Sequence, residues 1–284
     1  MSYLTHIRQC NSHDLKRFMP FYIADQRVGY VRPAVLDVLL GVSGFTSVRD
    51  GVAINSDCET FKDRTEALGE AAKELVAAGL SKMAGDELYG VKNSWEQCPL
   101  AAVNRGAAAA LGIRSYGVHV NGWRREASGK LSIWTGIRSA EKSVAPGKLD
   151  NMIAGGQPIG LTLMQNLIKE AAEEANVSET LARRAKPVSC ISYVMEDGDG
   201  LRPDVMFCYD LELPREFIPK NIDGEMSEFV LLPAEEAIRK VNETDEYKFN
   251  VNLVVTDFAV RHGLLNPDCT PDYTMIVQGL RGQV

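Results

Sequence analysis

The sequence has no pair of cysteines at the spacing that holds a structural metal. Its six cysteines are scattered, without a C-x-x-C pair: Cys10, Cys58, Cys98, Cys190, Cys208 and Cys269. Structural zinc sites need closely spaced cysteine or histidine pairs, and a chain of 284 residues can fold without a disulfide framework. We therefore expect reduced cysteines, most of them in the core, and no zinc site.

Long apolar runs and an excess of basic residues are also absent. No stretch approaches the roughly 18 apolar residues that cross a bilayer, and the start MSYLTHIRQC does not resemble a secretory leader. The formal net charge of −7 argues against a broad nucleic-acid surface of lysine and arginine. We expect a cytoplasmic protein with neither a membrane nor a nucleic acid as partner. Its oligomeric state stays open, with a homodimer as one alternative.

Two familiar motifs of catalysis and cofactor binding are missing as well. The stretches GGQPIG and GDGLRP lack the G-x-G-x-x-G spacing of a dinucleotide-binding turn. No serine, cysteine or histidine stands in the setting of a nucleophile elbow or a triad.

What is present is a chain whose two parts have different patterns. In residues 1–112, FYIADQRVGYV predicts paired strands, PAVLDVLLGV a helix opened by Pro33, and TSVRDGVAI a hairpin that turns at Asp50 and Gly51. Two further helices are expected in RTEALGEAAKELVAAGL, ended by Gly79, and in PLAAVNRGAAAALGI, ended by Gly112. We predict a small N-terminal α/β domain at 1–112.

The second part, residues 113–284, has longer strands. They are expected in SYGVHVNGW, KLSIWTGIRS, PVSCISYVME and DVMFCYDLEL, followed by helices in PAEEAIRKVNE and FNVNLVVTDFAVRHGLL. This order predicts a mixed sheet with one helix inserted between its strands. We predict that these residues form a second domain.

The inserted helix lies in GGQPIGLTLMQNLIKEAAEEANV, residues 155–177, after what we interpret as a Gly-Gly turn. Thr162 and Gln165 predict a capping box at its start. At about 100° per residue, Glu170, Glu173 and Glu174 share one face, beside the apolar face. Three carboxylates at this spacing repel one another, and a divalent cation with oxygen ligands would reverse that repulsion. A solvated acidic face is the alternative.

This stretch resembles the Nudix box, a glycine followed at fixed spacing by R-E-hydrophobic-x-E-E-x-G-hydrophobic. The matching residues are Gly155, Lys169, Glu170, Ala171, Glu173, Glu174, Asn176 and Val177. Three positions depart from the pattern: Leu161 stands at the first glutamate, Lys169 at the arginine and Asn176 at the second glycine. The change at Lys169 matters most, because lysine lacks the planar fork that orients a carboxylate bidentately.

The rest of the chain narrows the resemblance. RVGYV, ETFKDRTEAL, YGVHVNGW, KLDNMIAGG and LIKEAAEEA are similar to a Nudix subfamily related to the domain fused to yeast thiamin pyrophosphokinase, which also has plant members. The resemblance implies an α+β fold, a mixed sheet between helices, and a Mg²⁺ or Mn²⁺ cofactor. It also implies cleavage of a small-molecule diphosphate. Members that act on thiamin diphosphate or its oxidised analogues release phosphate and the monophosphate.

The resemblance also implies roles for single residues. Glutamates that match Glu170, Glu173 and Glu174 bind metal and act in catalysis in this family, and the carbonyl that matches Gly155 often adds a metal ligand. Glu225, in a loop before a short strand, is the candidate for one further catalytic carboxylate. Glu228 is its substitute, and an exposed loop acid is the alternative.

Substrate binding has candidates on the strands and on the acidic helix. His119 and Asn121, in a strand and the turn after it, can line a pocket with Lys169, or they can satisfy backbone groups in a hairpin. Trp123 and Trp134 can stack on a heterocycle, although large strand aromatics are usually core. We predict a Mg²⁺-dependent Nudix-type hydrolase, with thiamin diphosphate as the first substrate to test. The alternative is a non-catalytic Nudix-like metabolite sensor.

Overall fold

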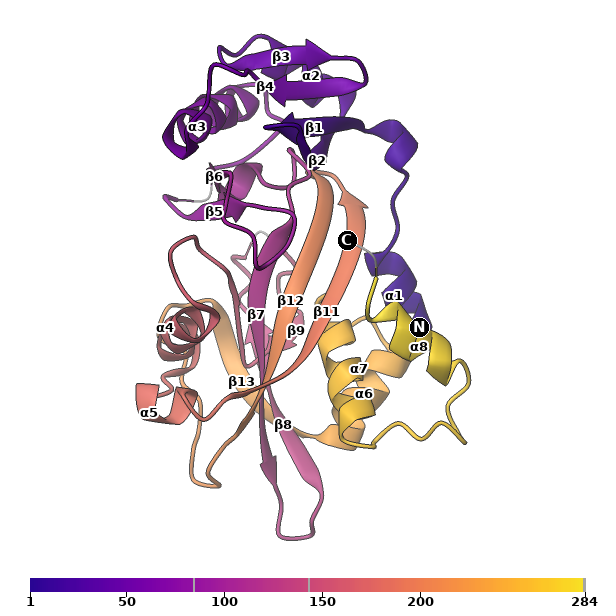
Figure 1. Ribbon diagram of the computed structural model, residues 1–284. Coiled ribbons are helices and arrows are strands. Elements are labelled where there is room, and N and C mark those ends of the chain that lie inside the picture. Colours follow the sequence, from indigo (N-terminus) through magenta and orange to yellow (C-terminus); the bar gives the residue numbers. More distant parts are fainter. Residues whose placement is uncertain (84, 143, 283–284) are drawn as a thin grey trace.

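Two sheets lie one above the other in Figure 1. The computed structural model describes residues 1–83, 85–142 and 144–282. Within these residues the upper sheet has four strands in the order β2-β1-β4-β3, and the lower sheet has seven. A two-stranded ribbon of β5 and β6 lies between them in the view of Figure 1.

The four-stranded sheet is built from local hairpins and covered by helices. Its elements are β1 (Met19–Ile23), β2 (Gln26–Val31), α2 (Pro33–Leu40), β3 (Phe45–Val48), β4 (Gly51–Ile54) and α3 (Phe61–Ala77). Both predicted strand pairs and the helix opened by Pro33 are confirmed. Gly51 is required at the β3–β4 turn, because a Cβ there would lie 2.0 Å from the Pro20 carbonyl oxygen. Leu68 and Leu75 of α3 are fully buried and close the core of this sheet.

The helix predicted in PLAAVNRGAAAALGI is wrong. Residues Ala101–Asn104 form β6, which pairs with β5 (Leu88–Val91), and a short 3₁₀ turn follows at Arg105–Ala107. The Asn104 side chain starts that turn by accepting the Gly106 N–H at 2.9 Å. All four β6 residues are buried, so tertiary pairing overrides the high helix propensity of alanine.

The seven-stranded sheet is mixed, as predicted. Its main path is β11-β12-β7-β8-β13, with β10 on β7 and β9 on β8. Strand β12 runs parallel to β7, whereas β8 and β10 run antiparallel to it. The strands are β7 (Ser115–Arg125), β8 (Leu131–Arg138), β9 (Leu149–Asn151), β10 (Ile153–Gly156), β11 (Lys186–Asp197), β12 (Gly200–Glu212) and β13 (Met226–Pro233).

Helices cover both faces of this sheet (Figure 1). One face carries α4 (Leu163–Ala175) and α5 (Glu179–Ala182). The other carries α1 (Tyr3–Cys10), α6 (Ala234–Glu243), α7 (Val251–Arg261) and α8 (Tyr273–Gly279). Each face has its own apolar core, and the protein is therefore an α/β/α sandwich of the predicted class. Among the described residues, no helix combines the length and the apolar character needed to span a bilayer.

The first helix belongs to the sandwich rather than to the four-stranded sheet that follows it. Tyr3 and Ile7 of α1 are buried in the core formed with α6, α7 and α8. His6 Nε2 lies 2.9 Å from the Val241 carbonyl oxygen, and Gly279 lies so close to Ile7 that a Cβ there would come 2.6 Å from its side chain. A 3₁₀ turn at Leu15–Arg17 then leads towards β1. Helix α1 thus belongs to the first predicted domain by sequence and packs with the second. The domain boundary at residue 112 stays a prediction.

The cysteines do not follow the predicted distribution. All six are free, but only Cys10 and Cys208 are buried, whereas Cys98, Cys190 and Cys269 are exposed. The expectation that most of them lie in the core is therefore wrong.

Candidate active site

Helix α4 begins and ends as its sequence predicts. Thr162 Oγ1 accepts the Gln165 N–H at 3.2 Å, and Gln165 Oε1 accepts the Thr162 N–H at 2.8 Å, which completes a capping box. Asn176 ends the helix in the left-handed conformation, with φ of 54°. Leu167 and Ala171 are fully buried against the sheet, and this packing sets the direction of every other side chain on the helix.

The three glutamates of α4 do not share one solvated face. Glu173 is half exposed, at 51% of its side-chain surface, whereas Glu170 is 13% exposed. Glu174 is buried, at 2%, because the apolar packing of α4 turns this position towards β10. The predicted single acidic face is therefore wrong: the acids occupy three different environments.

Glu174 is held against the edge of the sheet. Its carboxylate accepts the Ala154 N–H of β10 at 2.7 Å. Burial raises the pKa of Glu174 well above its usual range, and the nearby charges of Glu170, Asp150 and Glu225 raise it further. The Ala154 hydrogen bond opposes this rise without cancelling it. A buried carboxyl of this kind needs a cation or a proton.

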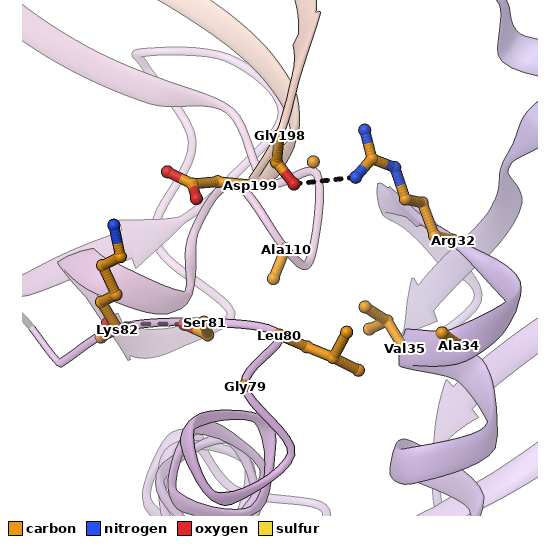
Figure 2. A pocket seen from close by; sticks show the side chains of 11 residues that line it. Arg32, Ala34, Val35, Gly79, Leu80, Ser81, Lys82, Ala110, Gly198 and Asp199 are labelled. Atoms are coloured by element: carbon orange, nitrogen blue, oxygen red, sulfur yellow. Dashed lines mark hydrogen bonds between the residues drawn. The ribbon is translucent and has the colours of Figure 1, made fainter. Parts of the chain in front are cut away.

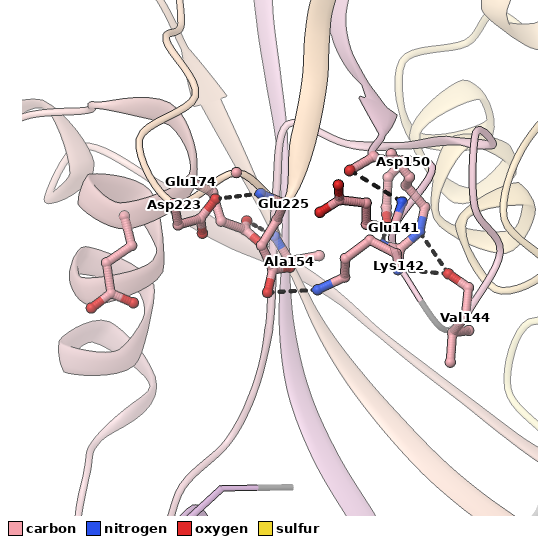
Figure 3. Close-up of polar contacts among 12 residues, drawn as sticks. Glu141, Lys142, Val144, Asp150, Ala154, Glu174, Asp223 and Glu225 are labelled. Atoms are coloured by element: carbon pink, nitrogen blue, oxygen red, sulfur yellow. Dashed lines mark hydrogen bonds and ion pairs between the residues drawn. The ribbon is translucent and has the colours of Figure 1, made fainter.

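Two further acids come to Glu174 from the loop before β13 (Figure 3). One carboxylate oxygen from each of Glu174, Asp223 and Glu225 lies within 4.8 Å of the others. Asp223 Oδ1 accepts the Glu225 N–H at 2.8 Å, and Lys142 Nζ lies 2.6 Å from Glu225 Oε1. Asp223 was missed in the sequence analysis; its place two residues before Glu225 was the available signal. Glu228, the predicted substitute, is an exposed residue of β13 and is absent from this group.

Gly155 lies in a strand, and the predicted Gly-Gly turn is wrong. Both glycines belong to β10, where Gly155 lies opposite Val118 of β7. A Cβ on Gly155 would lie 2.3 Å from Cδ of Glu170. The absence of a side chain at Gly155 therefore leaves room for the Glu170 carboxyl to lie against the backbone of β10. Lys169 Nζ pairs with Glu170 at 3.1 Å and with Glu173 at 2.9 Å.

Replacing Gly155 by alanine is expected to lower turnover at least about tenfold, because the added methyl group displaces the Glu170 carboxyl from its place. Steady-state kinetics on a diphosphate substrate measure the effect. Gly69→Ala is the matched control, since a Cβ at Gly69 in α3 meets nothing within 4 Å. Unchanged turnover in Gly155→Ala would contradict a role for the Glu170 position.

His119 and Asn121 lie inside β7 and form a buried network. His119 Nδ1 lies 2.9 Å from Asn151 Oδ1, and the Asn151 amide donates to Asn121 Oδ1 at 3.1 Å. Asn121 in turn donates to Asp210 at 3.0 Å. Burial lowers the pKa of His119 to about 4, and the charge of Lys248 contributes to this fall. Asn121 lies within the strand and not in a turn, and both side chains are buried among protein groups.

Two cavities differ in their relation to these groups. The larger, about 110 Å³, lies where Arg32 and residues 79–82 meet the β11–β12 turn (Figure 2). Arg32 donates to the Gly198 carbonyl oxygen at 2.9 Å there, and none of the site residues predicted from the sequence is among the described residues that line it. The smaller, about 80 Å³, includes Tyr89 and Gln157 and adjoins the end of β10. The smaller cavity is therefore the one beside the acids.

The acidic group fits a divalent metal ion. Its donors are carboxylate oxygens, the ligand type that hard cations such as Mg²⁺ and Mn²⁺ prefer. Glu174 is buried with its pKa raised, and Lys142 is the ammonium group paired with the cluster through Glu225. Three acids so close together are stabilised when an ion neutralises their charge. Glu174, Asp223 and Glu225 would hold such an ion.

The site thus combines an acidic helix packed on one face of a mixed sheet with two loop carboxylates beside it. Two relatives from Arabidopsis thaliana establish its kind. They are Nudix hydrolase 24, chloroplastic, with 37% identity over 98% of this chain and 77% of the relative, and Nudix hydrolase 20, chloroplastic, with 38% identity over the same shares. The chain belongs to the Nudix hydrolase family, and it is an enzyme that acts on diphosphates. Members of this family generally use divalent metal ions.

Other comparisons concern parts of the chain. Residues 2–115 match a family model described as a domain of unknown function (DUF4743). An uncharacterized protein of Saccharomyces cerevisiae is 32% identical over 77% of this chain and 68% of its own. A solved structure from Deinococcus radiodurans has 22% identity and a TM-score of 0.46, and it covers 61% of this chain and 98% of its own. The Nudix domain of Shewanella oneidensis NrtR, complexed with ADP ribose, has 14% identity and a TM-score of 0.42, covering 55% and 92%.

The cytoplasmic location predicted from the sequence is wrong on these comparisons, because both plant relatives are named as chloroplastic. The prediction rested on the absence of a secretory pattern and of apolar runs. Neither absence separates the cytoplasm from the interior of an organelle.

Proposed function

We propose that this enzyme uses Mg²⁺ or Mn²⁺ to hydrolyse the diphosphate linkage of a small organic molecule, giving the monophosphate and phosphate. The observation that carries the proposal is the meeting of Glu174, Asp223 and Glu225 within 4.8 Å of one another, beside the helix that matches the Nudix box. Thiamin diphosphate or an oxidised analogue is the first substrate to test. That choice rests on the subfamily resemblance of the sequence.

Some residues of the site would hold the ion, and others fix the position of those ligands. The bound ion would neutralise the diphosphate oxygens and lower the barrier to breaking the phosphate linkage. Glu174 is fixed by the Ala154 N–H, and Glu225 by Lys142, so neither carboxylate has to be ordered when substrate arrives. Asp223 is exposed and approaches from the solvent side.

The remaining acids of the box are proposed as partners in the same site. Glu170 lies against Gly155, whose carbonyl is the proposed backbone ligand, and its pKa is raised by burial despite the ammonium of Lys169. A carboxyl with a raised pKa can take a proton from water at neutral pH more readily than an exposed one. Glu173 is proposed as a further ligand; in this structure it is paired with Lys169.

The partner is proposed to be this small-molecule substrate, with neither a nucleic acid nor a membrane. The net charge of −7 opposes binding to a phosphate backbone. A homodimer is retained as a proposal, and light scattering of the purified chain measures the mass that tests it.

The function is tested by offering thiamin diphosphate, oxothiamin diphosphate and ADP-ribose with Mg²⁺, with Mn²⁺, and with a chelator. We expect metal-dependent release of phosphate and the thiamin monophosphate, measured by phosphate assay and chromatography, and no release with the chelator. Turnover of ADP-ribose alone would show that the thiamin assignment is wrong. No turnover of any compound with either metal would contradict diphosphate hydrolysis at this site.

A further inference from the structure

The smaller cavity lies where the segment around β5 meets the sandwich. Tyr89, Lys92 and Trp95 come from that segment, and Tyr116 and Gln157 come from the sandwich. These lining residues therefore come from both sides of residue 112. The cavity is about 80 Å³ and is partly open to solvent, so a ring can enter it partly while the rest of a ligand stays outside.

Consecutive residues of β10 and the residue after it lead from the acids to this cavity. Ala154 donates to Glu174, and Gly155 faces Glu170. A Cβ on Gly156 would lie 1.7 Å from Tyr89 Oη, and Gln157 lines the cavity itself. Three residues of strand span about 10 Å. A diphosphate lying at the acids can therefore place the group attached to it in the cavity.

The cavity has an aromatic wall and a cation. The Trp95 ring centroid lies 5.3 Å from that of Tyr116 and 5.1 Å from that of Phe207, edge-on to both. Lys92 Nζ lies 3.7 Å from the Trp95 centroid and donates to the Trp95 carbonyl oxygen at 2.7 Å. Trp95 is only partly buried, so part of its surface remains available to a ligand. Aromatic walls with a nearby cation suit a planar ring that carries phosphate.

Two buried polar atoms at this cavity lack a partner among the described residues. They are Tyr116 Oη and Gln157 Oε1, in side chains whose residues are 7% and 5% exposed. The Gln157 amide nitrogen donates to the Leu161 carbonyl oxygen at 2.8 Å and to that of Pro158 at 3.2 Å. These bonds orient the amide, so the free atom is an acceptor. Buried polar atoms are almost always hydrogen-bonded, and an exception needs an explanation such as a ligand.

We propose that this cavity binds the organic end of the diphosphate substrate, and that this end is a planar heterocycle with an N–H donor. The proposal rests on the proposed function and names the substrate class of the same site. Trp95 and Tyr116 contact the ring, Gln157 Oε1 accepts its N–H, and Lys92 faces the phosphate nearest to it. The segment around β5 thereby determines which diphosphates are accepted, whereas the acids of α4 and of the loop before β13 act on any of them.

Equilibrium binding measured without metal tests recognition of the ring separately from hydrolysis of the diphosphate. The probes are thiamin monophosphate, AMP and isopentenyl monophosphate, measured by calorimetry with a chelator present. The first two carry heterocycles with N–H donors and the third has no ring. We expect at least one ring compound to bind about tenfold more tightly than isopentenyl monophosphate, and Trp95→Ala to remove that advantage. Which ring compound binds identifies the source of the heterocycle.

Two variants keep the test independent of folding. Tyr116→Phe removes only Oη, which has no partner in the described chain, so its melting temperature is expected to stay at the wild-type value while ring affinity falls about fivefold. Phe61→Ala, at an exposed aromatic outside the cavity, is the control for Trp95→Ala and is expected to bind as wild type. Equal loss for the ringless probe, or unchanged ring affinity in both cavity variants, would overturn the proposal.

Kinetic measurements test the ring-binding role of the cavity separately from the proposed hydrolysis. With metal and a hydrolysed ring substrate, Trp95→Ala is expected to raise KM about tenfold and to leave kcat within about twofold. A fall in kcat with unchanged KM would overturn the binding role of Trp95. If ring probes bind as expected and no diphosphate is hydrolysed, the cavity assignment stands and the hydrolytic one fails.

Discussion

Glu174→Gln is expected to lower turnover at least about a hundredfold, and Glu173→Gln at least about tenfold, at saturating substrate. Glutamine keeps the shape of the side chain and removes a charged ligand. Glu174 has the larger effect because it is buried between Ala154 and the two loop acids, whereas Glu173 is half exposed. Steady-state kinetics over a Mg²⁺ titration measure both, and the Mg²⁺ concentration for half-maximal rate is expected to rise.

The control for these variants is Glu179→Gln. Glu179 forms an exposed i,i+4 pair with Arg183 on α5, much as Glu173 does with Lys169 on α4. Loss of such a pair costs little, so turnover is expected to stay within about twofold of wild type. Wild-type turnover in both Glu173→Gln and Glu174→Gln would remove the metal assignment of α4.

A chain that starts at Ile113 is expected to be insoluble, or to melt at least about 10 °C below the full chain. Its deletion removes α1, whose Tyr3, Ile7 and Cys10 fill the core beneath α7 and α8. It also removes the wall of the smaller cavity that Tyr89, Lys92 and Trp95 provide. Thermal melting with Mg²⁺ and the diphosphate panel, run on both chains, measure the two losses.

A second chain separates these two losses. Residues 1–14, joined to 113–284 by a flexible linker, restore α1 to its core and still lack the cavity wall. We expect this chain to recover solubility and metal-dependent hydrolysis while it loses selectivity among diphosphates. A soluble chain from Ile113 with the full-length melting point and the same substrate ranking would show that residues 1–112 neither stabilise the sandwich nor determine substrate selectivity.

The predictions from sequence are confirmed where neighbours along the chain determine the structure. The capping box of Thr162 and Gln165, the left-handed Asn176 and the turn at Asp50 and Gly51 depend on residues within a few positions of one another. The sequence pattern likewise identified the four long strands β7, β8, β11 and β12 of the large sheet, but not the short β9 and β10. Periodicity placed Glu174 near the apolar face, but only the docking of α4 on β10 shows that it is buried.

Predictions failed where distant parts of the chain decide. Ala101 and Ala102 form a strand because they pair with β5 and pack against α3, and composition alone does not predict this. Asp223 joins the acids through a loop 49 positions after Glu174, and no spacing rule connects the two. Gly155 looked like a turn glycine because glycine favours turns, yet its function here is to leave room for Glu170. The Trp95 cavity depends on a segment outside the Nudix box altogether.

The place of α1 also sets the order in which a newly made chain can fold. Tyr3 and His6 contact residues 238 and 241, which are 235 positions later, and Ile7 packs against Gly279. At 5 to 20 residues per second, α1 leaves the ribosome on the order of tens of seconds before α8 exists. The four-stranded sheet, between residues 19 and 77, can form within that interval. Throughout it the apolar side of α1 stays uncovered, because α7, α8 and β11, against which it packs, are made later.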